Sequence, residues 1–166
     1  MPVQRLNHAV LYVRDVDRSV AFYTEALGFR VLTSMPGRAA FLQAEGSTND
    51  HDLGLFAIGE AADSPAGRGA VGLYHLAWEV DTLGELDRIA GVLRERGSLV
   101  GASDHGSTKA LYAKDPDGLE FEVSWLVPAA LLGEGTGPAT RALDLPAEIA
   151  RYGADTQGGI GVSVRI

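Results

Sequence analysis

Cysteine is absent from the 166-residue chain, and histidine is scarce, with four residues. Without cysteine the chain can form neither disulfides nor thiolate zinc sites, and it has no cysteine nucleophile. Any metal site must therefore draw its protein ligands from histidine, aspartate and glutamate. The positions of the four histidines consequently carry much of the functional information in the sequence.

Positively charged residues are also few. The chain has 14 Lys and Arg residues and 22 Asp and Glu residues, so its net charge is 14 − 22 = −8 at pH 7. This excess of negative charge disfavours binding to a nucleic-acid backbone or to an anionic membrane surface. No apolar run reaches membrane-spanning length, and the start at Met1–Arg5 lacks the basic and apolar regions of a signal peptide. We therefore expect a cytoplasmic protein that binds neither nucleic acid nor membrane.

The segment 115–125 predicts a tight turn that leads into a strand. Pro116 and Gly118 suit the turn, because proline fixes φ at one turn position and glycine accepts a backbone conformation that other residues avoid. After the turn, bulky apolar residues alternate with polar ones, as in a strand with one buried face. The apolar set is Phe121, Val123 and Trp125, and the polar set is Glu120, Glu122 and Ser124. A carboxylate on the polar face is a candidate metal ligand, with Glu120 more suited to solvent or to an outer position.

Residues 1–58 predict a first module of one strand, one helix and three further strands. The helix is indicated by apolar residues at intervals of three and four, and glycine ends it at Gly28. The strands are expected over 6–13, 29–33, 39–44 and 53–58, and the helical face comprises Val16, Val20, Tyr23 and Leu27.

Residues 73–127 repeat this order after a Gly- and Ala-rich linker over 59–72. A strand over 73–80 leads into a capping box at Thr82 and Glu85, a helix, two short strands and the strand that follows Gly118. The remaining residues, 128–166, form a C-terminal extension in which we predict a helix over 143–152 and a strand over 158–164.

The two modules carry equivalent histidines. Leu6-Asn7-His8 corresponds to Leu73-Tyr74-His75, and the two histidines stand 75 − 8 = 67 positions apart. We therefore expect an α+β fold in which two βαβββ modules form a curved, open mixed β-barrel around a central metal cleft.

His8, His75 and Glu122 form a candidate metal triad. Two imidazoles and one carboxylate on one face of a metal leave the opposite positions open, an arrangement that suits non-haem Fe(II). A lone strand histidine is more often a hydrogen-bonded core residue. The repeat symmetry and the carboxylate on the last strand favour the metal site here.

In these features the sequence resembles the vicinal oxygen chelate superfamily, which includes glyoxalase I, extradiol dioxygenases, fosfomycin-resistance enzymes and bleomycin-binding proteins. The resemblance covers residues 4–127 as a single domain. It depends on the two histidine strands, the helix end Phe22-Tyr23-Thr24-Glu25-Ala26-Leu27-Gly28-Phe29, and the segment from Asp115 to Glu122.

Within the superfamily, four features favour the extradiol dioxygenases. The position equivalent to Glu122 in the first module falls near the apolar Leu55, where glyoxalase-like members carry an acid. The resemblance implies an acid–base role for His51, a substrate-side role for His105, and a hydrogen bond from Tyr112 to the bound substrate. The alternatives are a solvated His51, a turn role for His105 and an ordinary strand role for Tyr112.

The resemblance therefore implies an extradiol ring-cleaving dioxygenase that uses Fe(II), with Mn(II) as the alternative ion, and O2 as co-substrate. The expected ligand is a small aromatic diol, and the family leads us to expect a homodimer. A metal-dependent lyase or isomerase of the same fold and a metal-free binding protein are the alternatives. Phe41, Phe56, Trp78 and Trp125 are candidates either for the cleft lining or for the core.

Overall fold

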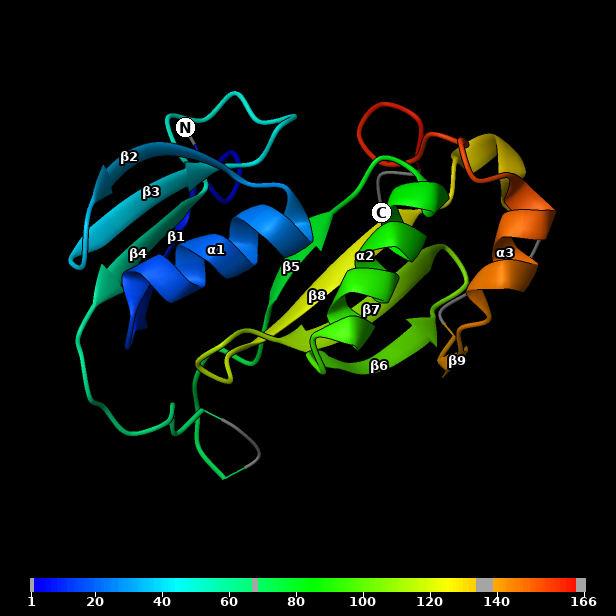
Figure 1. Ribbon diagram of the computed structural model, residues 1–166. Coiled ribbons are helices and arrows are strands. Elements are labelled where there is room, and N and C mark those ends of the chain that lie inside the picture. The colour runs from blue at the N-terminus through cyan, green and yellow to red at the C-terminus, as the bar shows by residue number, and fades with distance from the viewer. Residues whose placement is uncertain (1, 67–68, 134–138, 164–166) are drawn as a thin grey trace. The chain divides into compact units, whose positions relative to one another are not determined.

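A computed structural model describes residues 2–66, 69–133 and 139–163 and divides the chain into two compact units. The first unit comprises residues 1–64 together with 115–118, and the second comprises 65–114 together with 119–166. Each unit contains one mixed sheet with a helix packed against it (Figure 1). Among the described residues, no helix is both long and apolar enough to cross a membrane.

The first sheet has the strand order β1-β4-β3-β2. Its elements follow in the chain as β1 (Ala9–Val13), α1 (Val16–Leu27), β2 (Arg30–Met35), β3 (Ala39–Gln43) and β4 (Leu53–Ala57). Asp15 caps α1 by accepting a hydrogen bond from the Arg18 amide, and Gly28 ends the helix at φ 72°. The helix buries its apolar face, including Phe22, Tyr23 and Ala26.

The second sheet has the order β5-β8-β7-β6-β9 and repeats the same plan with one added strand. Its elements are β5 (Leu76–Glu79), α2 (Leu83–Glu95), β6 (Leu99–Asp104), β7 (Thr108–Lys114) and β8 (Glu120–Leu126). Thr82 caps α2 by accepting from the Glu85 amide, as the capping box predicted. The α+β class and the two βαβββ modules are confirmed, with both sheets open, whereas their union around a cleft stays a prediction.

The C-terminal extension belongs to the second unit. It contains the short helix η1 (Ala129–Leu131), β9 (Arg141–Ala142) at the edge of the second sheet, and α3 (Leu145–Tyr152), which contacts α2. The predicted helix is therefore confirmed, although it begins two residues later than expected. The predicted strand is wrong over 158–163, which form bends, turns and an isolated bridge at Ser163, and Val164 lies outside the described residues.

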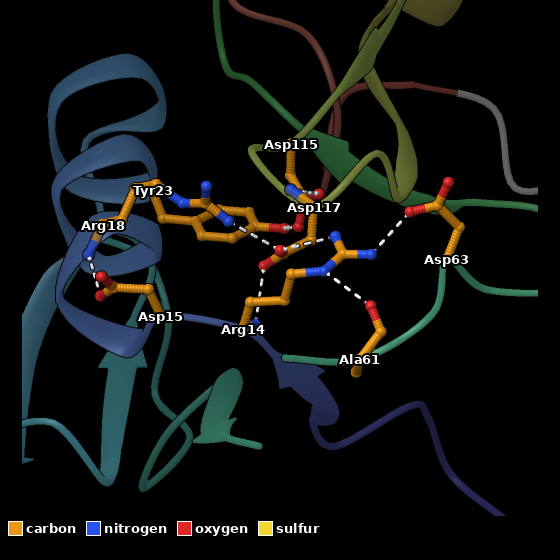
Figure 2. A network of polar contacts seen from close by, with 8 residues as sticks. All are labelled: Arg14, Asp15, Arg18, Tyr23, Ala61, Asp63, Asp115 and Asp117. Carbon is orange, nitrogen blue, oxygen red and sulfur yellow. Dashed lines mark hydrogen bonds and ion pairs between the residues drawn. The ribbon is translucent and has the colours of Figure 1, made fainter. Parts of the chain in front are cut away.

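The turn Asp115–Gly118 is part of the first unit, although β7 and β8 on either side of it belong to the second. Figure 2 shows the polar network that holds this turn. Asp117 accepts hydrogen bonds from the Arg14 amide at 3.2 Å, from Arg14 Nη1 at 3.1 Å and from Arg18 Nη2 at 2.7 Å. Asp115 accepts from the Tyr23 hydroxyl at 3.1 Å, and burial together with the Asp115 charge raises the Tyr23 pKa well above its usual value. The turn is therefore fixed by charge-assisted hydrogen bonds, of which the Tyr23–Asp115 bond is buried.

Candidate metal and proton-transfer site

Glu122 and His75 approach one another on the polar, partly buried face of the second sheet. Glu122 lies on β8 between Ala77 of β5 and Tyr112 of β7, on the face opposite the buried Phe121 and Val123. His75 stands one residue before β5, and its Nε2 atom lies 3.3 Å from Glu122 Oε2. Two ligands at right angles on one ion, each about 2.1 Å from it, lie about 3 Å apart. The pair therefore fits two adjacent positions on a transition metal.

The buried Nδ1 atom of His75 has no hydrogen-bond partner within the described part of the chain. A metal-bound histidine commonly donates a hydrogen bond from its other ring nitrogen. Within the described residues His75 lacks this second hydrogen bond, and its ring is positioned by Glu122 and by the Tyr74 and Tyr112 rings.

Tyr112 and His105 lie beside this pair. Tyr112 is opposite Glu122 in the β7–β8 register, and its hydroxyl lies 2.9 Å from His105 Nε2. Burial raises the Tyr112 pKa, and the negative charge of Glu122 and a hydrogen bond to its carboxylate add to the shift. The Tyr112 hydroxyl is therefore held in its protonated form, able to donate one hydrogen bond. The structure brings together four predicted site residues, His75, Glu122, Tyr112 and His105.

His8 and His51 form a second cluster, in the first unit. His8 stands one residue before β1, the same place that His75 has before β5. The centroids of the two imidazoles are 4.4 Å apart, and the Phe41 ring lies edge-on to His51 at 5.1 Å. Asn7 Oδ1 lies 2.7 Å from His8 Nδ1, and the His51 side chain is 17% exposed with Asp50 Oδ2 at 3.3 Å from its Nδ1. His51 is therefore a partly buried histidine packed beside a predicted ligand, and it is not a freely solvated surface residue.

Strand register corrects the position equivalent to Glu122 from Leu55 to Gly54. In the first unit Val10 pairs with Gly54 and Gly54 with Phe41, as in the second unit Ala77 pairs with Glu122 and Glu122 with Tyr112. Leu55 is fully buried, on the opposite face of its sheet. The sequence prediction was off by one residue. A shift of one residue moves a side chain to the opposite face of a strand. The first unit therefore offers a glycine in place of a fourth acidic ligand.

Within the described residues, no three His, Asp or Glu side chains gather closely enough to hold a metal ion. Neither unit alone therefore supplies the predicted triad, and His8 as the third ligand stays a prediction. Three of the four aromatic candidates separate into two groups. Trp125 is fully buried and donates to the Thr156 carbonyl, so it belongs to the core, while Phe41 and Phe56 pack edge to face at 5.8 Å beside His51.

Two polar features of the second unit were not predicted. The Ala139 carbonyl oxygen lies 2.8 Å from His105 Nδ1, and Lys109, which is 1% exposed, forms ion pairs with Asp104 and Glu148. No sequence signal could reveal a contact from a backbone carbonyl. For Lys109, the sequence offers only a weak signal, namely a lysine between Thr108 and Ala110 on an apolar strand.

Comparisons with known proteins agree with this arrangement. Residues 5–123 match the model of the Glyoxalase/Bleomycin resistance protein/Dioxygenase superfamily. The chain is 34% identical over 118 residues to a catechol-2,3-dioxygenase of Bacillus subtilis (strain 168), a match that covers 71% of this chain and 40% of the relative. It is 33% identical over 143 residues to a lactoylglutathione lyase of Salmonella typhimurium, which covers 80% of this chain and 98% of the relative.

A solved structure shows the same arrangement of elements. A glyoxalase/dioxygenase from Nostoc punctiforme matches with a TM-score of 0.60 and 25% sequence identity, over 73% of this chain and 90% of that one. The alignments therefore agree with a common fold and leave the reaction to be argued from the site residues.

Proposed function

Because the chain belongs to the Glyoxalase/Bleomycin resistance protein/Dioxygenase superfamily, we propose that it is an extradiol dioxygenase that opens the ring of a small catechol-like diol. The observation that carries the proposal is the placement of Tyr112 and His105, a proton-handling pair, beside the ligand-type pair His75 and Glu122. A ring-cleaving enzyme needs both groups, because its substrate must bind as a chelate and also lose protons.

The metal would be held by His8, His75 and Glu122. Two histidines and one carboxylate are the ligands of non-haem Fe(II) oxygenases, with Mn(II) as the alternative ion. When bound, the ion would supply a Lewis-acidic, redox-active centre for the diol and O2. Both atoms of O2 end in the ring-opened product, so the reaction needs no external reductant.

The remaining site residues would move protons and orient the diol. The Tyr112 hydroxyl can hydrogen-bond a diol oxygen while it stays paired with His105. His51 would take a proton from the substrate and return it later, since histidine changes protonation near neutral pH. The Phe41 ring beside His51 adds an apolar surface that suits an aromatic ligand.

A metal-dependent lyase is the second candidate function. It is favoured by the length of the match, because the alignment covers 98% of the lactoylglutathione lyase but 40% of the catechol-2,3-dioxygenase. It is disfavoured by Gly54, because the first-unit position equivalent to Glu122 then carries no acid. A metal-free binding protein has no use for the His75–Glu122 pair and is the third candidate.

The test is oxygen uptake by protein reconstituted anaerobically with Fe(II) and mixed with a panel of simple catechols. Uptake together with a yellow ring-opened product is expected. Tight metal binding without uptake would support the lyase, and protein that retains no metal would support the binding protein. Glu122→Gln should lose both metal and uptake, whereas the matched variant Glu120→Gln, altered on the same strand face, should keep both.

His51 is tested separately, as the proposed acid–base residue. We expect His51→Ala to keep one metal ion per chain and to lose at least about a hundredfold in kcat, the usual contribution of a positioned acid–base group. Metal content and oxygen uptake measured on the same sample check this prediction. A His51→Ala protein with the parent's kcat would show that His51 has no catalytic role.

A further inference from the structure

The C-terminal extension contacts the turn that carries His105 at several points. The superfamily match ends at residue 123, so the extension lies outside the part of the chain that defines the family. Three segments of the second unit meet here: the β6–β7 turn with His105, the segment Ala139–Ala142, and α3.

Ala139 determines which nitrogen of His105 carries the proton. The Ala139 carbonyl has no hydrogen to donate, so at 2.8 Å it must accept one from His105 Nδ1. In a neutral imidazole the other nitrogen, Nε2, is then an acceptor. At 2.9 Å that acceptor can receive the Tyr112 hydroxyl proton, for which the Glu122 carboxylate is the other acceptor. The direction of the hydrogen bond between Tyr112 and His105 therefore depends on a backbone atom of the extension.

The extension also holds the His105 turn in place. β9 pairs with the end of β6, with Ala142 opposite Ser103 and Arg141 opposite Asp104. Asp104 in turn accepts from the Gly106 amide at 2.8 Å, which closes the turn around His105. Displacement of β9 would therefore alter the position of His105, because its neighbours Asp104 and Gly106 are held by the same contacts.

A buried ion-pair cluster connects the same turn to α3. Lys109 donates to Asp104, and its Nζ atom lies 2.9 Å from Glu148 Oε2 on α3. Burial alone would raise the Asp104 pKa, but the hydrogen bonds from Lys109 and the Gly106 amide lower it. The charged carboxylate is therefore the form that holds the turn.

The end of the extension packs tightly against the second sheet. A Cβ atom at Gly158 would overlap the Leu126 carbonyl oxygen, so only glycine fits there. The Trp125 indole donates to the Thr156 carbonyl at 3.1 Å. The extension is therefore an integral part of the second unit.

We propose that residues 139–152 are a positioning element for the His105–Tyr112 pair, in which the Ala139 carbonyl selects the Nδ1–H tautomer of His105 and directs the Tyr112 hydroxyl toward it. The use of this pair in catalysis rests on the proposed function, but the tautomer selection does not. With Nε2 as the acceptor, Tyr112 can pass a proton to His105 and receive one from a substrate hydroxyl.

The test is ¹⁵N NMR of the histidine side chains in the metal-free 166-residue chain, where only four histidines need assignment. Spectra are recorded at about pH 8.5, well above the ordinary histidine pKa of about 6.5. We compare the parent with Arg141→Pro/Ala142→Pro, which removes both backbone donors of β9 and so weakens its pairing with β6. The matched control Arg141→Lys/Ala142→Ser keeps the donors and the charge.

We expect His105 in the parent and in the control to show two widely separated ¹⁵N signals, with the proton on Nδ1. In the proline variant these two signals should converge as both tautomers become populated, while the His51 and His75 signals stay unchanged and report an intact fold. An Nε2–H tautomer in the parent would overturn the proposal, as would a His105 spectrum unaffected by the prolines. Because no metal or substrate is present, failure of the ring-cleavage proposal would leave this result unchanged.

Discussion

At the scale of single residues, Gly54 and Glu122 show how two copies of one module can differ. They occupy equivalent places in the strand register, but only Glu122 carries a ligand atom. A Cβ atom at Gly54 would lie 3.4 Å from Val10 Cγ2 and 3.6 Å from the Phe41 ring, which are ordinary contacts. The added Cβ atom therefore fits at this position without displacing the backbone.

Gly54→Glu should convert the site toward four protein ligands. We expect the variant to retain its metal more tightly than the parent and to lose oxygen uptake, because the added carboxylate occupies a position that substrate or O2 requires. Metal retention under dialysis and oxygen uptake measure the two effects. The control Gly54→Gln has the same shape without the charge, and equal uptake by Gly54→Glu and the parent would contradict the prediction.

Tyr23 should make the stability of the protein depend on pH in the alkaline range. Its pKa in the folded protein is raised well above the ordinary value of 10.0, so above that pH the unfolded chain loses a proton that the folded protein keeps. The stabilisation from Tyr23 is therefore full below pH 10 and falls as the pH rises toward the raised value.

Comparison with Tyr23→Phe isolates this effect. At neutral pH the substitution should lower the free energy of unfolding by about 1.5–3 kcal/mol, since it removes a hydrogen bond to the Asp115 carboxylate. Above pH 10 the difference between the two proteins should shrink. Urea unfolding at several pH values measures it, and a constant difference would contradict the raised pKa.

The residues of the site were predictable to the extent that they lie on regular strands or directly beside them. The equivalent histidines and Glu122 follow from the repeat and from strand alternation, and the structure places both histidines one residue before their strands. The predicted equivalent of Glu122 was Leu55 instead of Gly54, because the repeat alignment did not fix the strand register. The Ala139 contact was not predictable, because a carbonyl oxygen is common to every residue.

At the scale of secondary-structure elements, the docking of α3 depends on charges inside the second unit. Lys109 is 1% exposed and lies between the carboxylates of Asp104 and Glu148, with the Tyr152 ring centroid 5.8 Å from its Nζ atom. If the lysine is removed, two carboxylates that are only 15% and 14% exposed lose their counter-ion, and such a loss is costly.

Lys109→Met should therefore lower the free energy of unfolding by about 3–5 kcal/mol. The matched control Lys114→Met alters an exposed lysine on the same strand and should change it by less than about 0.5 kcal/mol. Chemical denaturation measures both variants. Similar values for the two would show that the Lys109 ion pairs do not hold α3.

The elements themselves were largely predictable, and the exception is instructive. Helix periodicity and caps located α1, α2 and α3, because these signals are local. The glycine-rich end of the chain resembled a strand, but Gly158 is used for close approach to Leu126 and not for strand pairing. Such packing depends on residues distant in the sequence, and β9, with two residues, was too short to predict.

At the scale of the whole molecule, the two units are interleaved in the sequence. The chain passes from the first unit to the second, returns to the first for four residues at Asp115–Gly118, and then completes the second. Asp117 is the main anchor of the returning segment, because it accepts from Arg14 and Arg18 and its side chain is 5% exposed.

Asp117→Ala should separate the unfolding of the two units. We expect the free energy of unfolding of the first unit to fall by about 1.5–3 kcal/mol, the usual contribution of a hydrogen bond to a charged group. Both tryptophans lie in the second unit, so fluorescence reports that unit while circular dichroism reports the whole chain. In urea the two signals should coincide for the parent and diverge for the variant.

Asp63→Ala provides the control, because it removes an 89% exposed ion-pair partner of the same Arg14. It should leave the two signals coincident, since exposed ion pairs contribute little. Coincident signals in Asp117→Ala would show that the returning turn does not couple the units.

The returning turn also has a consequence for the order of events on the ribosome. When residue 64 has been added, Arg14, Arg18 and Tyr23 have been synthesised, but the carboxylates they bind follow only at Asp115 and Asp117. The first unit therefore waits through 118 − 64 = 54 further residues before its polar network can close. Maturation of the amino-terminal half is thus timed by the synthesis of the second half, and a nascent chain arrested before the turn should remain sensitive to proteases.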